Sequence, residues 1–156
     1  MVGAHRGCWC RDVREISIKV ENVKAVQDAI RLYGAKAERN ISRVIDATAL
    51  TINRDVKDAI DRGAKSGRLY RRRNIEHRAS APGQAPATDT GFLLSSIYYE
   101  RNTPLSATVG SRLDYAYFLE FGTVRIEPRP AWLPATEKNR EKFNRLLEEG
   151  IRKAAP

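Results

Sequence analysis

The chain has 156 residues, a formal net charge of +9 at pH 7, and 30% charged side chains. This length fits one domain of the commonest size. No run of 18 or more apolar residues is present, and no apolar run follows the arginines near the start. We therefore expect no membrane-spanning helix and no secretory signal, and so a soluble protein made in the cytoplasm.

The first twelve residues follow no periodic pattern, and we expect them to form a disordered or extended tail. They contain Cys8 and Cys10, the only cysteines, with His5 close by. A structural zinc site needs about four ligands, and its paired ligands are usually separated by two to four residues. We therefore expect two reduced thiols, with no metal site and no cofactor.

Residues 13–156 are expected to form a single domain, which opens with a strand and a long helix. Ile16, Ile18 and Val20 alternate with polar residues, as in a half-buried strand. From Val23 to residue 60 apolar residues then recur at steps of three and four, which predicts one amphipathic helix that Gly34 could interrupt. A helix of about 38 residues would be roughly 57 Å long. Because so small a domain cannot cover that length, part of the apolar stripe is expected to contact a neighbouring subunit.

The helical periodicity is lost at residues 62–91, which we predict to be a long loop, first basic and then rich in proline and glycine. Residues 62–80 carry seven basic side chains and one acidic side chain, so about two thirds of the net charge lies there. A hairpin is predicted at 95–111, a short helix from Tyr115 to Gly122, an extended passage at 128–134 and a last helix at 135–154. The expected fold is α+β, with a small antiparallel sheet packed against the long N-terminal helix and the C-terminal helix.

Residues arranged for catalysis are not found in the sequence. The two histidines are not associated with a nucleophile motif of the form Gly-x-Ser-x-Gly. Gly63 and Gly67 are separated by three residues, whereas a phosphate-binding loop needs four between its glycines. We therefore predict that the protein is not an enzyme.

The strongest chemical signal is a cluster of arginines around Tyr70. Guanidinium groups suit the geometry of phosphates, and an aromatic ring beside them can stack on a base. The same arginines can equally pair with acidic groups of another protein. The cluster consists of Arg68, Arg71, Arg72 and Arg73, of which the last three are the candidate phosphate contacts.

Three motifs in sequence resemble a known family. They are ASAPGQAPATDTG at 79–91, YAYFLEFGT at 115–123 and RPAWLPA at 129–135, preceded by Gly-Arg-Leu-Tyr at 67–70. Together they resemble the siphophage neck and tail-component proteins, which are structural proteins of the head–tail junction. The resemblance is close over 67–135 and departs from the family pattern at Phe92, where a polar residue is commoner.

The resemblance implies a ring-forming neck subunit in the virion, acting in head–tail joining or tail completion after assembly in the host cytoplasm. It implies a hexamer or dodecamer around the channel that the genome DNA traverses, with head-completion or connector proteins and tail-terminator or tail-tube proteins as neighbours, and no membrane. A tail terminator, which caps the tail tube, is an open alternative, as is a nucleic-acid-binding module that uses the arginines. The residues expected to contact other subunits or partners are Arg68, Tyr70, Arg71, Arg72, Arg73, Pro82, Pro86, Glu120, Phe121, Arg129 and Trp132.

Overall fold

The computed structural model describes residues 23–72 and 74–155. Its longest element is the helix α1 (Val23–Arg62). The predicted helix is confirmed, and Gly34 does not interrupt it. Gly63 follows the last turn, and its N–H donates to the carbonyl of Ala59 at 3.1 Å. The strand predicted at Ile16–Val20 and the tail of residues 1–12 lie outside the described residues.

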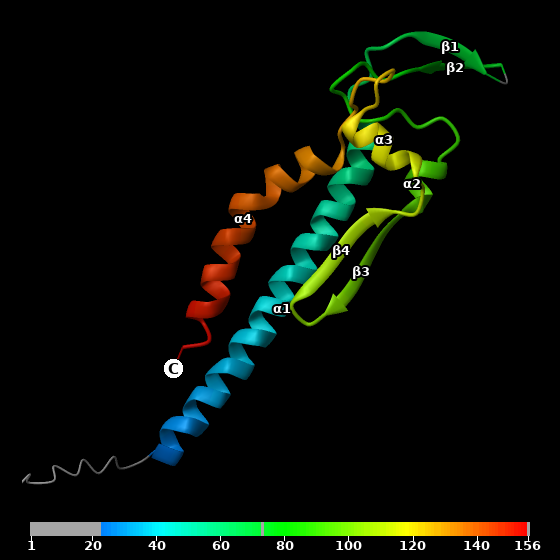
Figure 1. Cartoon of the computed structure of the whole chain (residues 1–156). Helices are drawn as coiled ribbons and strands as arrows, with labels where there is room; N and C mark the ends of the chain where they lie inside the picture. Colours follow the sequence, from blue (N-terminus) through cyan, green and yellow to red (C-terminus); the bar gives the residue numbers. More distant parts are fainter. Residues whose placement is uncertain (1–22, 73, 156) are drawn as a thin grey trace, which may run out of the picture.

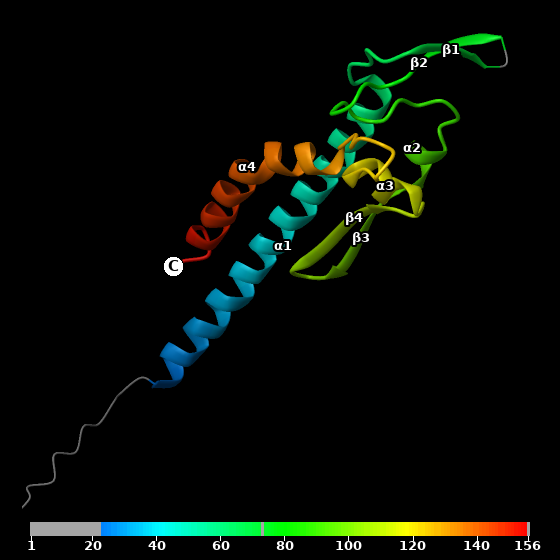
Figure 2. The same ribbon diagram turned by 45° about the horizontal axis from the view of Figure 1, so that its top comes forward.

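The C-terminal helix and one β-hairpin pack along α1 on two different sides (Figure 1). Helix α4 (Trp132–Arg152) lies along one side, and the hairpin of β3 (Ile97–Thr103) and β4 (Ser106–Ser111) lies along the other. The α+β fold is thus confirmed, and the rotated view in Figure 2 shows the same arrangement.

Polar contacts show that α1 and α4 are antiparallel. Near one end of the contact, the side-chain amide of Asn40 donates to the carbonyl of Gly150 at 3.0 Å. Towards the other end, the amide of Asn139 donates to the carboxylate of Asp55 at 2.8 Å. Asn139 is buried, so this hydrogen bond holds the two helices in one register.

The hydrogen bond from Asn139 to Asp55 makes the stability of the fold depend on pH in the acidic range. Burial by itself raises the pKa of Asp55, but the hydrogen bonds from Asn139 and Lys138 and the charge of Lys138 outweigh it, so this pKa lies below its ordinary value. A lowered pKa means that the charged form stabilises the folded state; this contribution is present above pH of about 4 and is lost as pH falls through the folded pKa. We expect Asp55→Asn to flatten the decrease in melting temperature below about pH 4, whereas Asp58→Asn, at an exposed position of the same helix, should leave it unchanged. If the melting temperatures of the wild type and of Asp55→Asn decreased equally below about pH 4, this expectation would be contradicted.

The hairpin β3–β4 confirms the prediction at 95–111. Its strands are antiparallel with Tyr99 opposite Val109, and a register shift lies between Arg101 and Thr103. The hydroxyl of Tyr99 donates to Asp46 on α1 at 2.7 Å, and Arg101 forms an ion pair with the same carboxylate at 3.0 Å. These contacts fasten the hairpin to α1.

The structure contains one short helix and two short strands that were not predicted from the sequence. A five-residue helix, α2 (Phe92–Ser96), precedes β3 and is too short to show a helical period. A second hairpin, β1 (Leu69–Arg72) with β2 (Ile75–Arg78), lies inside the segment that was predicted to be a loop. Its side chains are mostly exposed, so apolar residues do not mark its two faces. Residues 79–91 then form neither helix nor strand.

The short predicted helix is confirmed as α3 (Tyr115–Phe121), and Gly122 ends it with a φ of 76°. The last helix, predicted from about 135 to 154, is confirmed as α4, but it begins three residues earlier, at Trp132, and so takes in the end of the passage predicted to be extended at 128–134. Pro134 therefore lies in the first turn of the helix. A proline is tolerated there because the first N–H groups of a helix have no partner within it.

The core is small and lies at the C-terminal half of α1. Val56 and Ile60 are fully buried, and they cluster with Ile97, Ala131 and Ala135. The N-terminal part of α1 extends well beyond this core and beyond α4 and the hairpin (Figures 1 and 2). Its apolar residues are exposed there: Val26 56%, Ile30 64%, Leu32 68%, Tyr33 37%.

Candidate partner-binding surfaces

The three motifs that carry the family resemblance meet around one cavity of about 210 Å³. Its lining includes Tyr70 from β1, Ser80 and Pro86 from the loop, Leu119 from α3, and Arg129. Ser80 is 2% exposed, and its hydroxyl has no hydrogen-bond partner among the described residues; the same holds for the buried Nε of Arg129. Segments more than 50 residues apart in the chain thus build one region, which lies beside the hairpin β1–β2.

The hairpin separates the arginines that the sequence groups together. Successive residues of a strand point to opposite faces, so Tyr70 and Arg72 share one face while Arg71 lies on the other. The carboxylate of Asp89 forms an ion pair with Arg72, and it lies 3.6 Å from Nε2 of His77. Arg72 is therefore paired within the chain, and it lies on the opposite face of the strand from Arg71.

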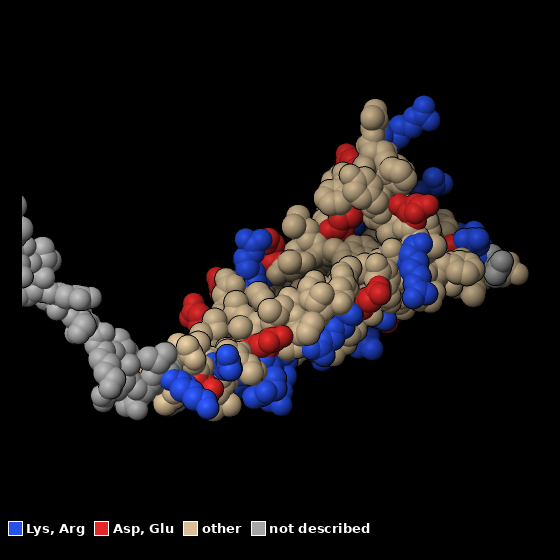
Figure 3. All heavy atoms as spheres, turned by 60° about the horizontal axis from the view of Figure 1, so that its bottom comes forward, with Lys and Arg blue, Asp and Glu red and all other residues tan. Residues whose placement is uncertain are grey.

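The other arginines of the predicted cluster differ in their surroundings. Arg68 and Arg71 are exposed, and Arg71 lies opposite Glu76 in the hairpin. Arg73 lies outside the described residues. On the face shown in Figure 3, Lys and Arg side chains alternate with Asp and Glu along the molecule and do not form one basic patch. The ring of Tyr70 stacks on that of His77, with centroids 5.5 Å apart.

The proline loop is anchored by a lysine that the sequence analysis did not single out. Lys65 Nζ donates to the carbonyls of Ala85 and Pro86, both at 2.9 Å, and to that of Ala59 in the last turn of α1 at 3.1 Å. Burial lowers the pKa of Lys65 even though the charge of Asp61 raises it. Pro86 is buried at this anchor, whereas Pro82 is exposed.

Removing the anchor should loosen the loop. Lys65→Met keeps most of the side-chain volume but leaves three carbonyls without this donor, so we expect a loss of about 1–3 kcal/mol in the free energy of unfolding. Residues 79–91 should also be cleaved faster in limited proteolysis. Lys142→Met, at an exposed position of α4, is the matched control and should change neither quantity. Equal cleavage rates in the two variants would show that Lys65 does not hold the loop.

Glu120 is turned into the molecule. It is 9% exposed, and its carboxylate accepts hydrogen bonds from the backbone N–H groups of Ala131 at 2.8 Å, Trp132 at 3.2 Å and Leu133 at 2.7 Å. These groups lie at the start of α4, where a negative charge is favourable. Glu120 was expected to contact a partner, and in the structure its carboxylate caps α4. A glutamate twelve residues before the first residue of a helix gives no local signal of this role.

The next residue, Phe121, lies in an exposed aromatic surface on α3. Tyr117 is 64% exposed, Phe118 50% and Phe121 65%. The ring centroid of Tyr117 lies 4.8 Å from that of Phe121 and 5.9 Å from that of Phe118, so the three rings form one cluster. An exposed apolar patch of this kind is typical of a protein–protein contact.

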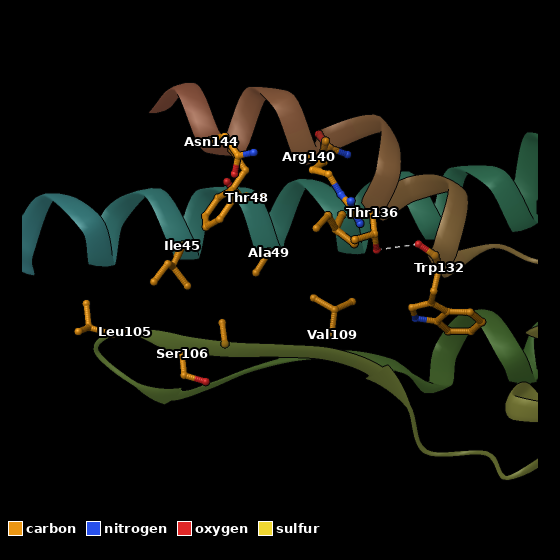
Figure 4. A pocket seen from close by; sticks show the side chains of 14 residues that line it. Ile45, Thr48, Ala49, Leu105, Ser106, Val109, Trp132, Thr136, Arg140 and Asn144 are labelled. Carbon is orange, nitrogen blue, oxygen red and sulfur yellow. Dashed lines mark hydrogen bonds between the residues drawn. The ribbon is translucent and has the colours of Figure 1, made fainter. Parts of the chain in front are cut away.

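Trp132 lies at the end of a groove of about 710 Å³ between α1, α4 and β4 (Figure 4). Ile45 and Ala49 from α1 and Val109 from β4 point into this groove. The indole Nε1 of Trp132 is buried and has no acceptor among the described residues. The groove continues past Trp132 into a second hollow of about 660 Å³, which Phe121 also lines.

Residues 23–72 and 74–155 contain no group of three His, Cys, Asp or Glu side chains that could hold a metal ion. No described helix is both long enough and apolar enough to span a membrane. His5, Cys8 and Cys10 lie outside the described residues.

The comparisons with known proteins identify the family. The model of the HK97-gp10-like family, described as "Bacteriophage HK97-gp10, putative tail-component", matches residues 15–122. The match begins earlier than the resemblance noted in the sequence and ends before the motif at 129–135. Comparisons with curated proteins and with solved structures gave no match. Because the family model covers more than half of the chain, the chain belongs to the HK97-gp10-like family and is a tail-component structural protein of a tailed bacteriophage virion.

Proposed function

We propose that this protein is a ring-forming neck subunit that joins the filled head to the tail, and that its role is structural and not enzymatic. The observation that carries the proposal, beside family membership, is the apolar stripe on the part of α1 that extends past the rest of the molecule. Among residues 23–72 and 74–155, Val26, Ile30 and Tyr33 do not belong to the hydrophobic core. Their exposure is therefore best explained by burial against another subunit.

A closed ring requires two different surfaces on each subunit. The exposed stripe on α1 supplies one of them, and the aromatic surface of Tyr117, Phe118 and Phe121 supplies the other. Figure 1 places α3 and the N-terminal end of α1 at opposite ends of the molecule. Such an arrangement supports a head-to-tail contact between copies, in a hexamer or dodecamer, in preference to a two-fold dimer.

The hairpin β1–β2 and the loop that follows it extend from the far end of α1 (Figure 2). In the proposed ring they reach the neighbouring rings, formed by head-completion or connector proteins on one side and tail-terminator or tail-tube proteins on the other. The candidate contacts with the genome DNA in the channel remain Arg71, Arg72 and Arg73, of which Arg72 is also paired with Asp89.

Disruption of the gene in the phage tests the joining role. Electron microscopy of the lysate should show full heads and separate tails of normal length. Tails of uncontrolled length would identify a tail terminator, and intact infectious particles would contradict both roles.

Binding of the purified chain to DNA tests the remaining alternative. A nucleic-acid-binding module would bind duplex DNA at about 50 mM salt and lose affinity steeply as salt rises. We expect little binding, because the arginines lie on opposite faces of the hairpin and one of them is paired. Tight binding that is abolished by Arg71→Ala with Arg73→Ala, and kept by Lys142→Ala, would favour a DNA-binding role.

A further inference from the structure

The strand β4 has a free edge without the features that usually protect one. It pairs only with β3 among the described residues, and its sequence, Ser106-Ala-Thr-Val-Gly-Ser111, contains neither a charged residue nor a proline. Exposed strand edges are commonly blocked by charges or prolines, because an unblocked edge accepts another strand. The other strand of the sheet, β3, carries Glu100 and Arg101.

The apolar groove lies beside this edge. All its sheet residues come from the turn and from β4, namely Leu105, Ser106, Ala107 and Val109, and none comes from β3. Figure 4 shows β4 running along the groove, facing α1 and α4. An added strand here would form backbone hydrogen bonds with β4 and place alternate side chains between the sheet and the helices.

The chain contains a segment of the required kind. Residues 15–20, Glu-Ile-Ser-Ile-Lys-Val, place Ile16, Ile18 and Val20 on one face and polar side chains on the other. An added strand whose one face enters an apolar groove and whose other face meets water needs this alternation.

The chain that connects this segment to the start of α1 is too short for the segment to reach the groove of its own copy. Ile45, which faces the near end of the groove, lies about 33 Å along α1 from Val23. An extended chain from Val23 back to Ile16 covers at most about 24 Å. The occupant must therefore come from another copy.

We propose that residues 15–20 of one copy add as a strand to the edge of β4 in a second copy, with Ile16, Ile18 and Val20 in the groove. A backbone carbonyl of the added strand could then accept from the orphaned Nε1 of Trp132, at the end of the groove. The inference rests on the proposed function in that both require association between copies, and it names the contact by which one copy joins the next.

Photo-cross-linking of the full-length chain tests the contact. Replacing Ser17 by p-benzoylphenylalanine puts a photoreactive group on the polar face of the segment, and mixing copies labelled with ¹⁴N and ¹⁵N separates interchain from intrachain products. We expect an interchain product that joins position 17 to residues 105–111, the strand that the segment would pair with. The double substitution Ile16→Ser with Ile18→Ser should reduce it at least about tenfold, because two large apolar side chains no longer enter the groove. Lys19→Ser, on the polar face, should leave it unchanged.

Substitutions on the receiving side give a second control. Ala107→Lys introduces a charge at a residue that lines the groove, and should abolish the product. Thr108→Lys adds the same charge on the opposite face of β4 and should keep it. Thermal unfolding checks that each variant is folded.

Interchain products elsewhere, intrachain products alone, or insensitivity to Ile16→Ser with Ile18→Ser would overturn the inference. If no product forms in solution, the measurement is repeated on virions in which the photoreactive chain replaces the native one, and absence in both preparations also overturns it. The proposed function fails separately, if the gene-disrupted phage is infectious, and the cross-link in solution is unaffected by that result.

Discussion

Replacing Ile60 by Ala should lower the free energy of unfolding by about 3 kcal/mol. Ile60 is fully buried and is one of only two large side chains in the described residues that are completely shielded from solvent. Its removal leaves a cavity in a core that otherwise consists mainly of Val56, Ile97 and two alanines. So few residues leave little packing to close the cavity. Urea denaturation of the purified chain measures the change, and a loss below about 1 kcal/mol would mean that the core does not lie where the structure places it.

The same substitution at Ile30 is the matched control. Ile30 belongs to the same helix, but it lies in the extended part of α1 and is 64% exposed. Ile30→Ala should change the stability of the isolated chain by no more than about 0.5 kcal/mol. It should instead weaken incorporation into virions, if the stripe forms a subunit contact as proposed. A large destabilisation of the isolated chain by Ile30→Ala would contradict the view that this stripe is unpartnered.

Replacing Glu120 by Ala should cost about 2–3 kcal/mol and loosen the start of α4. The three N–H groups of Ala131, Trp132 and Leu133 lose their acceptor, and an unpaired buried donor costs about 1–3 kcal/mol. Water that enters the hollow beside α3 can accept hydrogen bonds from some of these N–H groups. The total loss in the free energy of unfolding is therefore smaller than three times the cost of one unpaired donor. Thermal unfolding and amide hydrogen exchange at Ala131–Leu133 measure the effect.

Glu141→Ala, at an exposed position of α4, removes the same type of side chain without touching the cap. It should leave both the melting temperature and the exchange rates near those of the wild type. If Glu120→Ala behaved like Glu141→Ala, the contact of Glu120 with α4 would be of no energetic importance. That result would favour the predicted role of Glu120 as a partner contact.

The family motifs acquire a structural explanation from the cavity that they surround. Lys65 and Thr88 hold the proline loop against the end of α1, and Arg129 is joined to α3 by the hydrogen bond from its N–H to Leu119 at 2.7 Å. Much of the motif region therefore builds the end of the molecule from which the hairpin β1–β2 extends. Of the residues predicted to contact partners, the exposed ones in the described part of the chain are Arg68, Tyr70, Arg71, Arg72, Pro82 and Phe121, and Trp132 lines the groove.

The sequence by itself determined the elements whose signals are local. The length of α1 follows from apolar residues at steps of three and four and from Gly63 behind its last turn. The hairpin at 97–111 follows from alternation around a turn, and the end of α3 follows from Gly122, which adopts a positive φ. Each signal depends on residues within about one turn of helix or one strand pair, which is why a pattern in the chain is enough.

The tertiary structure alone decided what depends on residues distant in the chain. It placed Asp89 beside Arg72 and thereby divided the arginine cluster. It brought the carboxylate of Glu120 to the start of α4, and it left the groove beside β4 open. Such contacts are set by how elements pack around the small core, and the energy of each depends on burial and on partners that spacing along the chain does not encode.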